Sequence, residues 1–172
     1  NILHEDVCSI CQDDVSVLNN ATYMQYTCCG KAMHNKCFKQ LLDSKSLTFE
    51  TRNSCPMCRA LVVGTGSKED IERLQRWSQL GKSWAKFSLA CAYERGKHAK
   101  DKFVKKDPKR AFELYKSAAD QGNHHAQYSV ARLYATGEGV TKSEKLSFKY
   151  TKISAEQGIG ETQFKVGMAY MI

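Results

Sequence analysis

The chain is 172 residues long, 42% of its residues are hydrophobic, and its formal net charge is +8. This length allows one domain or two small ones. No segment approaches the roughly eighteen consecutive apolar residues of a transmembrane helix. The first six residues show neither a basic start nor an apolar run, so no signal peptide is visible. The chain begins without Met, so it is compatible with a fragment whose targeting signal lies upstream.

Charge and cysteine are distributed unevenly along the chain. Residues 1–64 contain six basic and six acidic residues, whereas residues 65–172 contain twenty basic and twelve acidic ones. Seven of the eight cysteines lie before residue 59, and only Cys91 lies beyond it. Two halves of such different composition predict two domains. The odd number of clustered cysteines, their paired spacing and the lack of a signal peptide favour metal ligands over disulfides.

The clustered metal-binding residue types occur as four pairs. In chain order they are Cys8 and Cys11, Cys28 and Cys29, His34 and Cys37, and Cys55 and Cys58. Two intervening residues let a tight turn direct both donor atoms at one zinc ion, with sulfur about 2.3 Å from the metal. Four such pairs make two closed tetrahedral sites. A closed site is structural and has no open position for substrate, so direct metal catalysis is not expected.

With these eight residues in register, residues 5–62 resemble the RING finger family. The resemblance implies a small zinc-stabilised α+β finger with two structural Zn²⁺ ions. In that family the first and third ligand pairs share one ion, and the second and fourth pairs share the other. Carried over, Cys8, Cys11, His34 and Cys37 bind the first zinc, and Cys28, Cys29, Cys55 and Cys58 bind the second.

One feature departs from the common RING pattern, in which the third and fourth ligands are separated. Here Cys28 and Cys29 are adjacent, and Lys31 stands where many members have histidine. A protonated lysine has no lone pair for a metal, so both adjacent cysteines are assigned as ligands.

The ligand order also matches PHD fingers, which read histone tails. That alternative is disfavoured because Asn53 stands where PHD fingers usually have an aromatic residue. In addition, no tryptophan precedes Trp77 to build a methyl-lysine cage, and residues 55–59 resemble the closing turn of a RING.

RING ubiquitin ligases position a ubiquitin-charged conjugating enzyme and use no covalent nucleophile of their own. By resemblance, Ile10, Leu41 and Pro56 would contact the conjugating enzyme, and Arg59 would clamp ubiquitin against it through its guanidinium. Each residue also has a plainer interpretation. Ile10 and Leu41 could be core residues, Pro56 could set a turn, and Arg59 could be a solvated charge.

The second half begins with a boundary at residues 62–67, where Ser67 is expected to cap a helix over residues 68–80. Superimposing Gly81, Gly122 and Gly158 then reveals an internal repeat, with spacings of 41 and 36 residues. Residues 109–122 and 145–158 also match each other, with apolar or small residues at helical spacing. The small residues would let helices approach closely, and Gly122 and Gly158 suit left-handed helix ends.

This pattern resembles the Sel-one-like repeat, a relative of the tetratricopeptide repeat. The resemblance implies an all-α helical-repeat solenoid for protein–protein interaction. We expect a RING-type finger at residues 1–64, a linker and leading helix at residues 65–82, and two repeats plus the start of a third at residues 83–172. Cys91 is interpreted as a buried inert thiol. His98, His124 and His125 lack partners at metal spacing and are assigned surface or capping roles.

Residues 95–110 form a basic stretch with eight basic and two acidic residues. A solvated loop and a docking site for an acidic protein are both compatible with it. Nucleic-acid binding is not expected, because no interleaved aromatic residues or known motif accompany the charge.

The leading hypothesis is a zinc-binding RING-type ubiquitin-protein ligase scaffold in the cytoplasm or nucleus. Its expected partners are a ubiquitin-conjugating enzyme, ubiquitin, and a protein substrate or complex partner on the repeats. The alternative is a zinc-stabilised adaptor without ligase activity. The sequence names neither the substrate, the conjugating enzyme nor the ubiquitin linkage.

Overall fold

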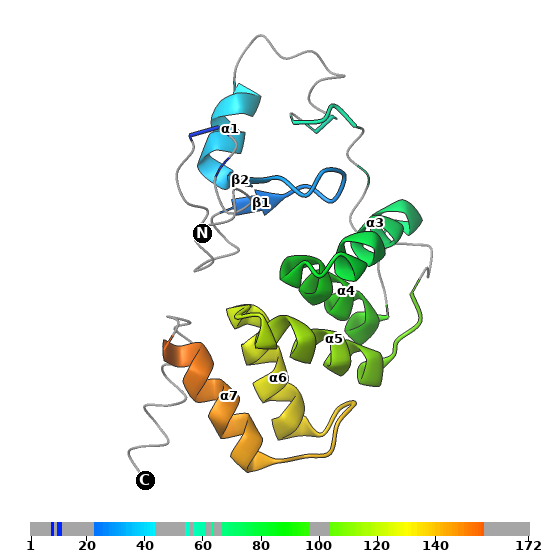
Figure 1. Cartoon of the computed structure of the whole chain (residues 1–172), viewed down its shortest axis with the longest axis vertical. Helices are drawn as coiled ribbons and strands as arrows, with labels where there is room; N and C mark the ends of the chain where they lie inside the picture. Colours follow the sequence, from blue (N-terminus) through cyan, green and yellow to red (C-terminus); the bar gives the residue numbers. More distant parts are fainter. Residues whose placement is uncertain are drawn as a thin grey trace. The chain divides into compact units, whose positions relative to one another are not determined.

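The computed structural model describes residues 8, 10–11, 23–43, 54–55, 57–60, 63, 67–96 and 104–156. The chain divides into two compact units, residues 1–64 and residues 65–172, which are described separately below (Figure 1). Within the described ranges, every helix is too short or too polar to cross a bilayer.

The first unit contains a short hairpin followed by a helix. Strands β1 (Tyr23–Gln25) and β2 (Ala32–His34) are antiparallel, with Met24 opposite Met33. The turn between them is closed by the Tyr26 N–H, which donates to the Lys31 carbonyl at 3.0 Å, and by Gly30, whose φ is +70°. Helix α1 (Asn35–Asp43) follows β2 without a loop. This continuity places two residues of the same ligand pair, His34 and Cys37, on either side of the strand–helix junction.

The core of the first unit is small. Its buried described residues are Cys8, Tyr26, Ala32, Met33, Cys37 and Cys55. Phe38 of α1 packs edge-on against Tyr26, with ring centroids 6.4 Å apart. Three of these six buried residues are cysteines, so the candidate ligands themselves make up half of the apolar interior.

The second unit is a series of antiparallel helices (Figure 1). They are α3 (Lys68–Gln79), α4 (Ser83–Arg95), α5 (Pro108–Asp120), α6 (His124–Thr136) and α7 (Glu144–Glu156). Each packs against the next along the chain.

The helix starts follow from side-chain caps. Ser67, Asp107 and Asn123 each accept a hydrogen bond from the backbone N–H three residues on, at 3.2, 3.0 and 2.9 Å. Such caps satisfy N–H groups that have no partner inside the helix.

Close helix packing in the second unit depends on alanine. The buried alanines are Ala85, Ala90, Ala92, Ala111, Ala118, Ala119, Ala126 and Ala131, each no more than 4% exposed. Larger side chains, among them Tyr115 and Leu133, fill the spaces between the helices. Aromatic contacts join α6 to the helices before and after it, because the Tyr134 ring centroid lies 5.3 Å from that of Phe112 and 6.0 Å from that of Tyr150. The sequence pattern of small and aromatic residues is therefore a packing pattern.

The predicted fold class, a Cys/His-rich α+β finger followed by an all-helical repeat segment, is confirmed. The helix expected at residues 68–80 is observed at residues 68–79 with Ser67 as its cap. Gly122 adopts the expected left-handed conformation, with φ +85°. The basic loop at residues 97–103, Gly158 and the start of the third repeat lie outside the described residues.

His124 differs from its predicted surface or capping role. Its exposed fraction is only 2%, and Asn123, one residue earlier, provides the cap. The imidazole Nε2 finds no hydrogen-bond partner among the residues that the structure describes. At this residue the start of α6 contacts α7, because the Ser154 hydroxyl donates to the His124 backbone carbonyl at 3.4 Å.

We expect Gly139→Ala to destabilise the repeats more than Gly81→Ala. Both glycines have positive φ, +75° and +86°, which costs an L-residue about 1–2 kcal/mol. A Cβ at Gly81 meets nothing within 4 Å, whereas at Gly139 it would overlap the Pro108 carbonyl and come within 2.9 Å of the Lys109 nitrogen. Urea unfolding followed by helical circular dichroism measures both free energies, and equal values would contradict the close approach.

We expect acid to destabilise the second unit through His124. Burial, and then repulsion from His125, lower the pKa of His124 to about 4 from its usual 6.5. As pH falls below 6.5, the unfolded chain takes up a proton that the folded chain refuses, so stability falls until pH reaches about 4, by up to about 1.4 kcal/mol per pH unit. The measurement is the unfolding free energy of wild type minus that of His124→Gln across this range. A difference independent of pH would refute the assignment.

Candidate functional site

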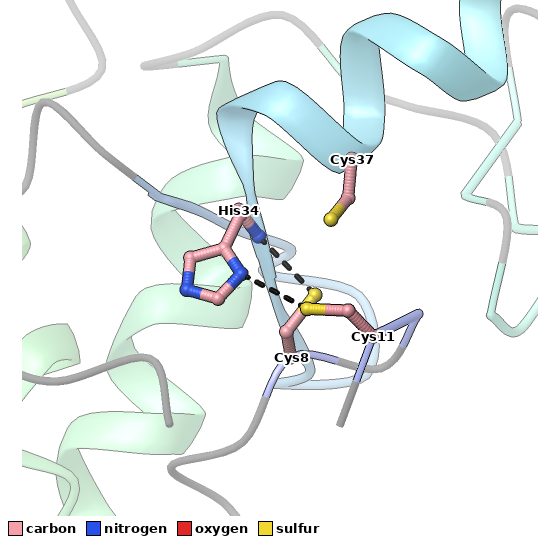
Figure 2. Close-up of side chains that lie close together, drawn as sticks. All are labelled: Cys8, Cys11, His34 and Cys37. Carbon is pink, nitrogen blue, oxygen red and sulfur yellow. Dashed lines mark hydrogen bonds between the residues drawn. The ribbon is translucent and has the colours of Figure 1, made fainter. Parts of the chain in front are cut away.

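Four side chains from two separate segments converge at the β2–α1 junction. Cys8 and Cys11 flank a turn, His34 ends β2, and Cys37 lies in the first turn of α1 (Figure 2). One donor atom from each lies within 4.8 Å of the donor atoms of the other three. We call Cys8, Cys11, His34 and Cys37 the first ligand group.

The distances in the first ligand group suit a tetrahedral zinc site. His34 Nδ1 lies 3.3 Å from Cys11 Sγ, and the His34 backbone N–H donates to Cys8 Sγ at 3.5 Å (Figure 2). A nitrogen and a sulfur bound to one zinc at tetrahedral angles are about 3.5 Å apart. A backbone N–H on a ligand sulfur is the kind of outer interaction that orients metal ligands.

A second ligand group, made of Cys28, Cys29, Cys55 and Cys58, lies between the hairpin turn and the last cysteine pair. Cys29 Sγ is 3.7 Å from Cys55 Sγ, and Cys58 Sγ is 3.4 Å from Cys28 Sγ. Two sulfurs bound to one zinc are about 3.8 Å apart, and a disulfide would require about 2.05 Å. The described residues include all eight cysteines, and none of these forms a disulfide. The structure thus brings both adjacent cysteines, Cys28 and Cys29, to the same point.

Burial and neighbouring thiols oppose the ionisation of two cysteines of the second group, Cys28 and Cys29. Burial, followed by the neighbouring Cys55, raises the pKa of Cys29 to about 11, despite a backbone N–H from Lys31 that lowers it. Burial and the thiols of Cys58 and Cys55 also raise the pKa of Cys28. Several thiolates crowded together need a cation to neutralise them, and a coordinating metal ion deprotonates thiols outright.

In the first ligand group, backbone N–H groups lower the pKa of a thiol. Burial opposes ionisation of Cys8, but N–H groups of Cys11, His34 and Ile10 lower its pKa to about 6. A thiolate is the form that binds metal, so the turn around Ile10 prepares this ligand. The donor sets and spacings of both groups therefore fit zinc.

Tyr26 is a site residue that the sequence analysis missed. Burial raises its pKa to about 12, with further contributions from Cys55, Cys28 and Cys29. Within the described part of the chain, its hydroxyl has no hydrogen-bond partner. The sequence signal was an aromatic residue two positions before the adjacent cysteines, directly after strand β1.

The structure describes three of the four candidate partner-binding residues. Ile10 lies in the first turn with 46% of its surface exposed. Leu41 is half-buried on α1, and Pro56 lies outside the described residues.

Arg59 is exposed and adopts a left-handed backbone, φ 59°, that is uncommon for a non-glycine residue. It is held there because its N–H donates to the Cys55 carbonyl at 2.8 Å. The closing turn of the second ligand group therefore fixes the direction in which the Arg59 side chain leaves the backbone.

Each of the two units matches a known protein family. The Ring finger domain matches residues 6–59, and the Sel1 repeat matches residues 85–123 and 124–159. A search of curated proteins gave no match.

Solved structures share the helical fold. A Sel1 repeat protein from Oxalobacter formigenes is similar at 24% identity and a TM-score of 0.57, over 64% of this chain and 43% of that one. Helicobacter pylori cysteine rich protein B is similar at 23% identity and a TM-score of 0.51, over 56% of this chain and 69% of that one. A protective antigen of uropathogenic Escherichia coli with an SLR fold is similar at 31% identity and a TM-score of 0.55, over 64% of this chain and 23% of that one.

The chain thus spans less than half the length of the first and third of these proteins. Four converging ligand pairs, a hairpin leading into a helix, and stacked helix pairs agree with the two family matches. The chain therefore carries a RING finger domain followed by Sel1 repeats.

Proposed function

We propose that this protein is a RING-type ubiquitin-protein ligase that acts as a scaffold. The finger would dock a ubiquitin-charged conjugating enzyme, and the repeats would bind a substrate or a complex partner. The observation that carries this proposal is the convergence of the two ligand groups, which supports a finger whose turns are held in fixed positions. The proposed division of the chain is a finger at residues 1–64, a linker and leading helix at residues 65–82, and repeats from residue 83.

The proposed cofactor is two structural zinc ions, one in each ligand group. Each group offers four donors, so zinc would supply cross-links between turns and leave no position for a substrate. Because free thiols persist in reducing compartments, we propose the cytoplasm or nucleus as the site of action.

Catalysis would come from positioning. Ile10 protrudes from the turn between the first two ligands, and its exposed surface could pack against a conjugating enzyme. Arg59 follows the last ligand directly, so its guanidinium could donate to carbonyl groups of both ubiquitin and the enzyme. Holding the thioester in a reactive pose would raise the rate of ubiquitin transfer, because the reacting groups are already oriented.

The alternative is an adaptor that binds zinc but has no ligase activity. It is favoured by Leu41, which is half-buried and therefore offers little apolar surface on α1. A direct test of ubiquitin transfer separates the two functions.

Native mass spectrometry of the whole chain is expected to find two zinc ions. Cys29→Ser should lose one ion, because it removes a thiolate from the second ligand group. Cys91→Ser is the matched control and should keep both, since Cys91 lies in the repeats. If Cys29→Ser retains two ions, Cys29 is not a ligand and the second site has another fourth donor.

Discharge of ubiquitin from a charged conjugating enzyme to free lysine should be accelerated by wild type with at least one enzyme of a panel. Ile10→Ala should reduce this acceleration about tenfold, because a contact of this size contributes about 1.5 kcal/mol or more. Arg59→Ala should slow discharge while leaving binding of the uncharged enzyme nearly unchanged.

Lys105→Ala, which removes an exposed charge from the repeats, is the control and should match wild type. Zinc content is checked for each variant, so that loss of activity is not loss of the finger. No acceleration with any enzyme would reject the ligase and leave the adaptor. Equal activity of Arg59→Ala and wild type would reject only the clamp.

A further inference from the structure

The repeats contain an open pocket of about 680 Å³ between α4, α5 and α6. Its size lies within the roughly 300–1,000 Å³ that is usual for ligand pockets. Phe87 of α4 and Tyr115 of α5 form an aromatic wall, with ring centroids 5.7 Å apart. All the lining residues belong to the second unit.

Both carboxylates that line the pocket are already engaged. Glu94 Oε2 accepts a hydrogen bond from the Tyr115 hydroxyl at 2.7 Å, and its Oε1 pairs with Arg132. Glu138 pairs with Lys106 at 2.8 Å, and this bond lowers the pKa of Glu138. The acidic groups therefore fix the arrangement of the pocket and are not free to bind a cationic ligand.

The pocket retains one uncompensated positive charge. Arg95 lines it, is exposed, and forms no ion pair with any residue in the described ranges. With Lys106 and Arg132, the lining holds three cations and two carboxylates. Arg95 and Lys106 also belong to the basic stretch at residues 95–110, so the stretch contributes to a site and is not only a solvated loop.

We propose that this pocket binds an acidic side chain in a peptide segment of a partner protein, with the carboxylate on Arg95 and a neighbouring apolar side chain against Phe87. The inference deepens the proposed protein-binding role of the repeats and does not depend on ligase activity. A guanidinium suits a carboxylate because it can donate two parallel hydrogen bonds. The excess of basic over acidic residues in residues 65–172, twenty against twelve, would attract such a segment from a distance.

A nucleic acid fits the pocket less well than a peptide does. Lys106 pairs with Glu138 and Arg132 pairs with Glu94, so few cations of the described lining remain to neutralise a continuous phosphate backbone. Binding of single strands also relies on aromatic faces open for base stacking, and Tyr115 is only 1% exposed. A peptide needs a single carboxylate at Arg95 and can direct its own N–H groups towards the two glutamates.

The test begins with selection of random twelve-residue peptides displayed on phage, using the immobilised zinc-loaded chain. We expect the enriched peptides to carry Asp or Glu next to an apolar residue. The best of them is synthesised with a fluorescent label, and its dissociation constant is measured by anisotropy. Arg95→Gln should weaken binding about tenfold, because hydrogen bonds between charged groups are the strong ones. Lys109→Gln makes the same charge change on an exposed residue outside the pocket and should change binding less than about twofold.

Two further measurements place the peptide in the pocket. Cys91 lines it, so a bound peptide should slow modification of this thiol by N-ethylmaleimide, read by mass spectrometry of the Cys91 fragment. Ser129→Glu adds a carboxylate to the lining and should weaken binding at least as much as Arg95→Gln. Helical circular dichroism of each variant should equal that of wild type.

Several results would overturn the proposal. They are the failure of acidic peptides to be enriched, equal effects of Arg95→Gln and Lys109→Gln, and peptide binding that leaves Cys91 unprotected. Protection of Cys91 by a single-stranded RNA but not by the acidic peptide would assign the pocket to nucleic acid instead. No ubiquitin component enters these assays, so their failure is distinct from failure of the ligase.

Discussion

The first unit depends on the meeting of donor atoms from turns that are distant in sequence. Half of its buried described residues are cysteines, so candidate ligands form much of the interior in the part of the unit that the structure describes. Small domains often need a metal or disulfides. Burial and then contacts with other thiols of the group raise the pKa of Cys28 and Cys29, and a bound cation would stabilise their thiolates.

The second unit reaches stability by a different route. Its helices pack mainly against their neighbours along the chain, as in other repeat arrays, and the Arg132–Glu94 ion pair adds a link from α6 to α4. Alanines at the interfaces bring the helix backbones close, and Tyr115 and Leu133 fill the remaining space. The described lining residues of the pocket all belong to this unit, so we expect the pocket to persist when zinc is removed from the finger.

Under the proposed function, the two units would provide two kinds of recognition. On the finger, Ile10 and Arg59 lie in the turns that carry the candidate ligands, so partner binding there would depend on metal binding. In the repeats, the pocket is ordered by ion pairs, since Glu94 holds both Tyr115 and Arg132. A ligase needs both a general partner, the conjugating enzyme, and a specific one, the substrate. The proposed function assigns the first to the finger and the second to the repeats.

The sequence alone was sufficient for the fold class, for the grouping of the candidate ligands that the structure brings together, and for the helix that begins after Ser67. Ligand spacing, N-caps such as Ser67 and helical periodicity are local properties, readable from neighbouring residues. Three features needed the tertiary structure: the distances from the Cys28 and Cys29 thiols to those of Cys58 and Cys55, the burial of His124, and the pocket around Arg95. Each joins residues from segments far apart in the sequence, and their approach is decided by how the turns fold and how the helices pack.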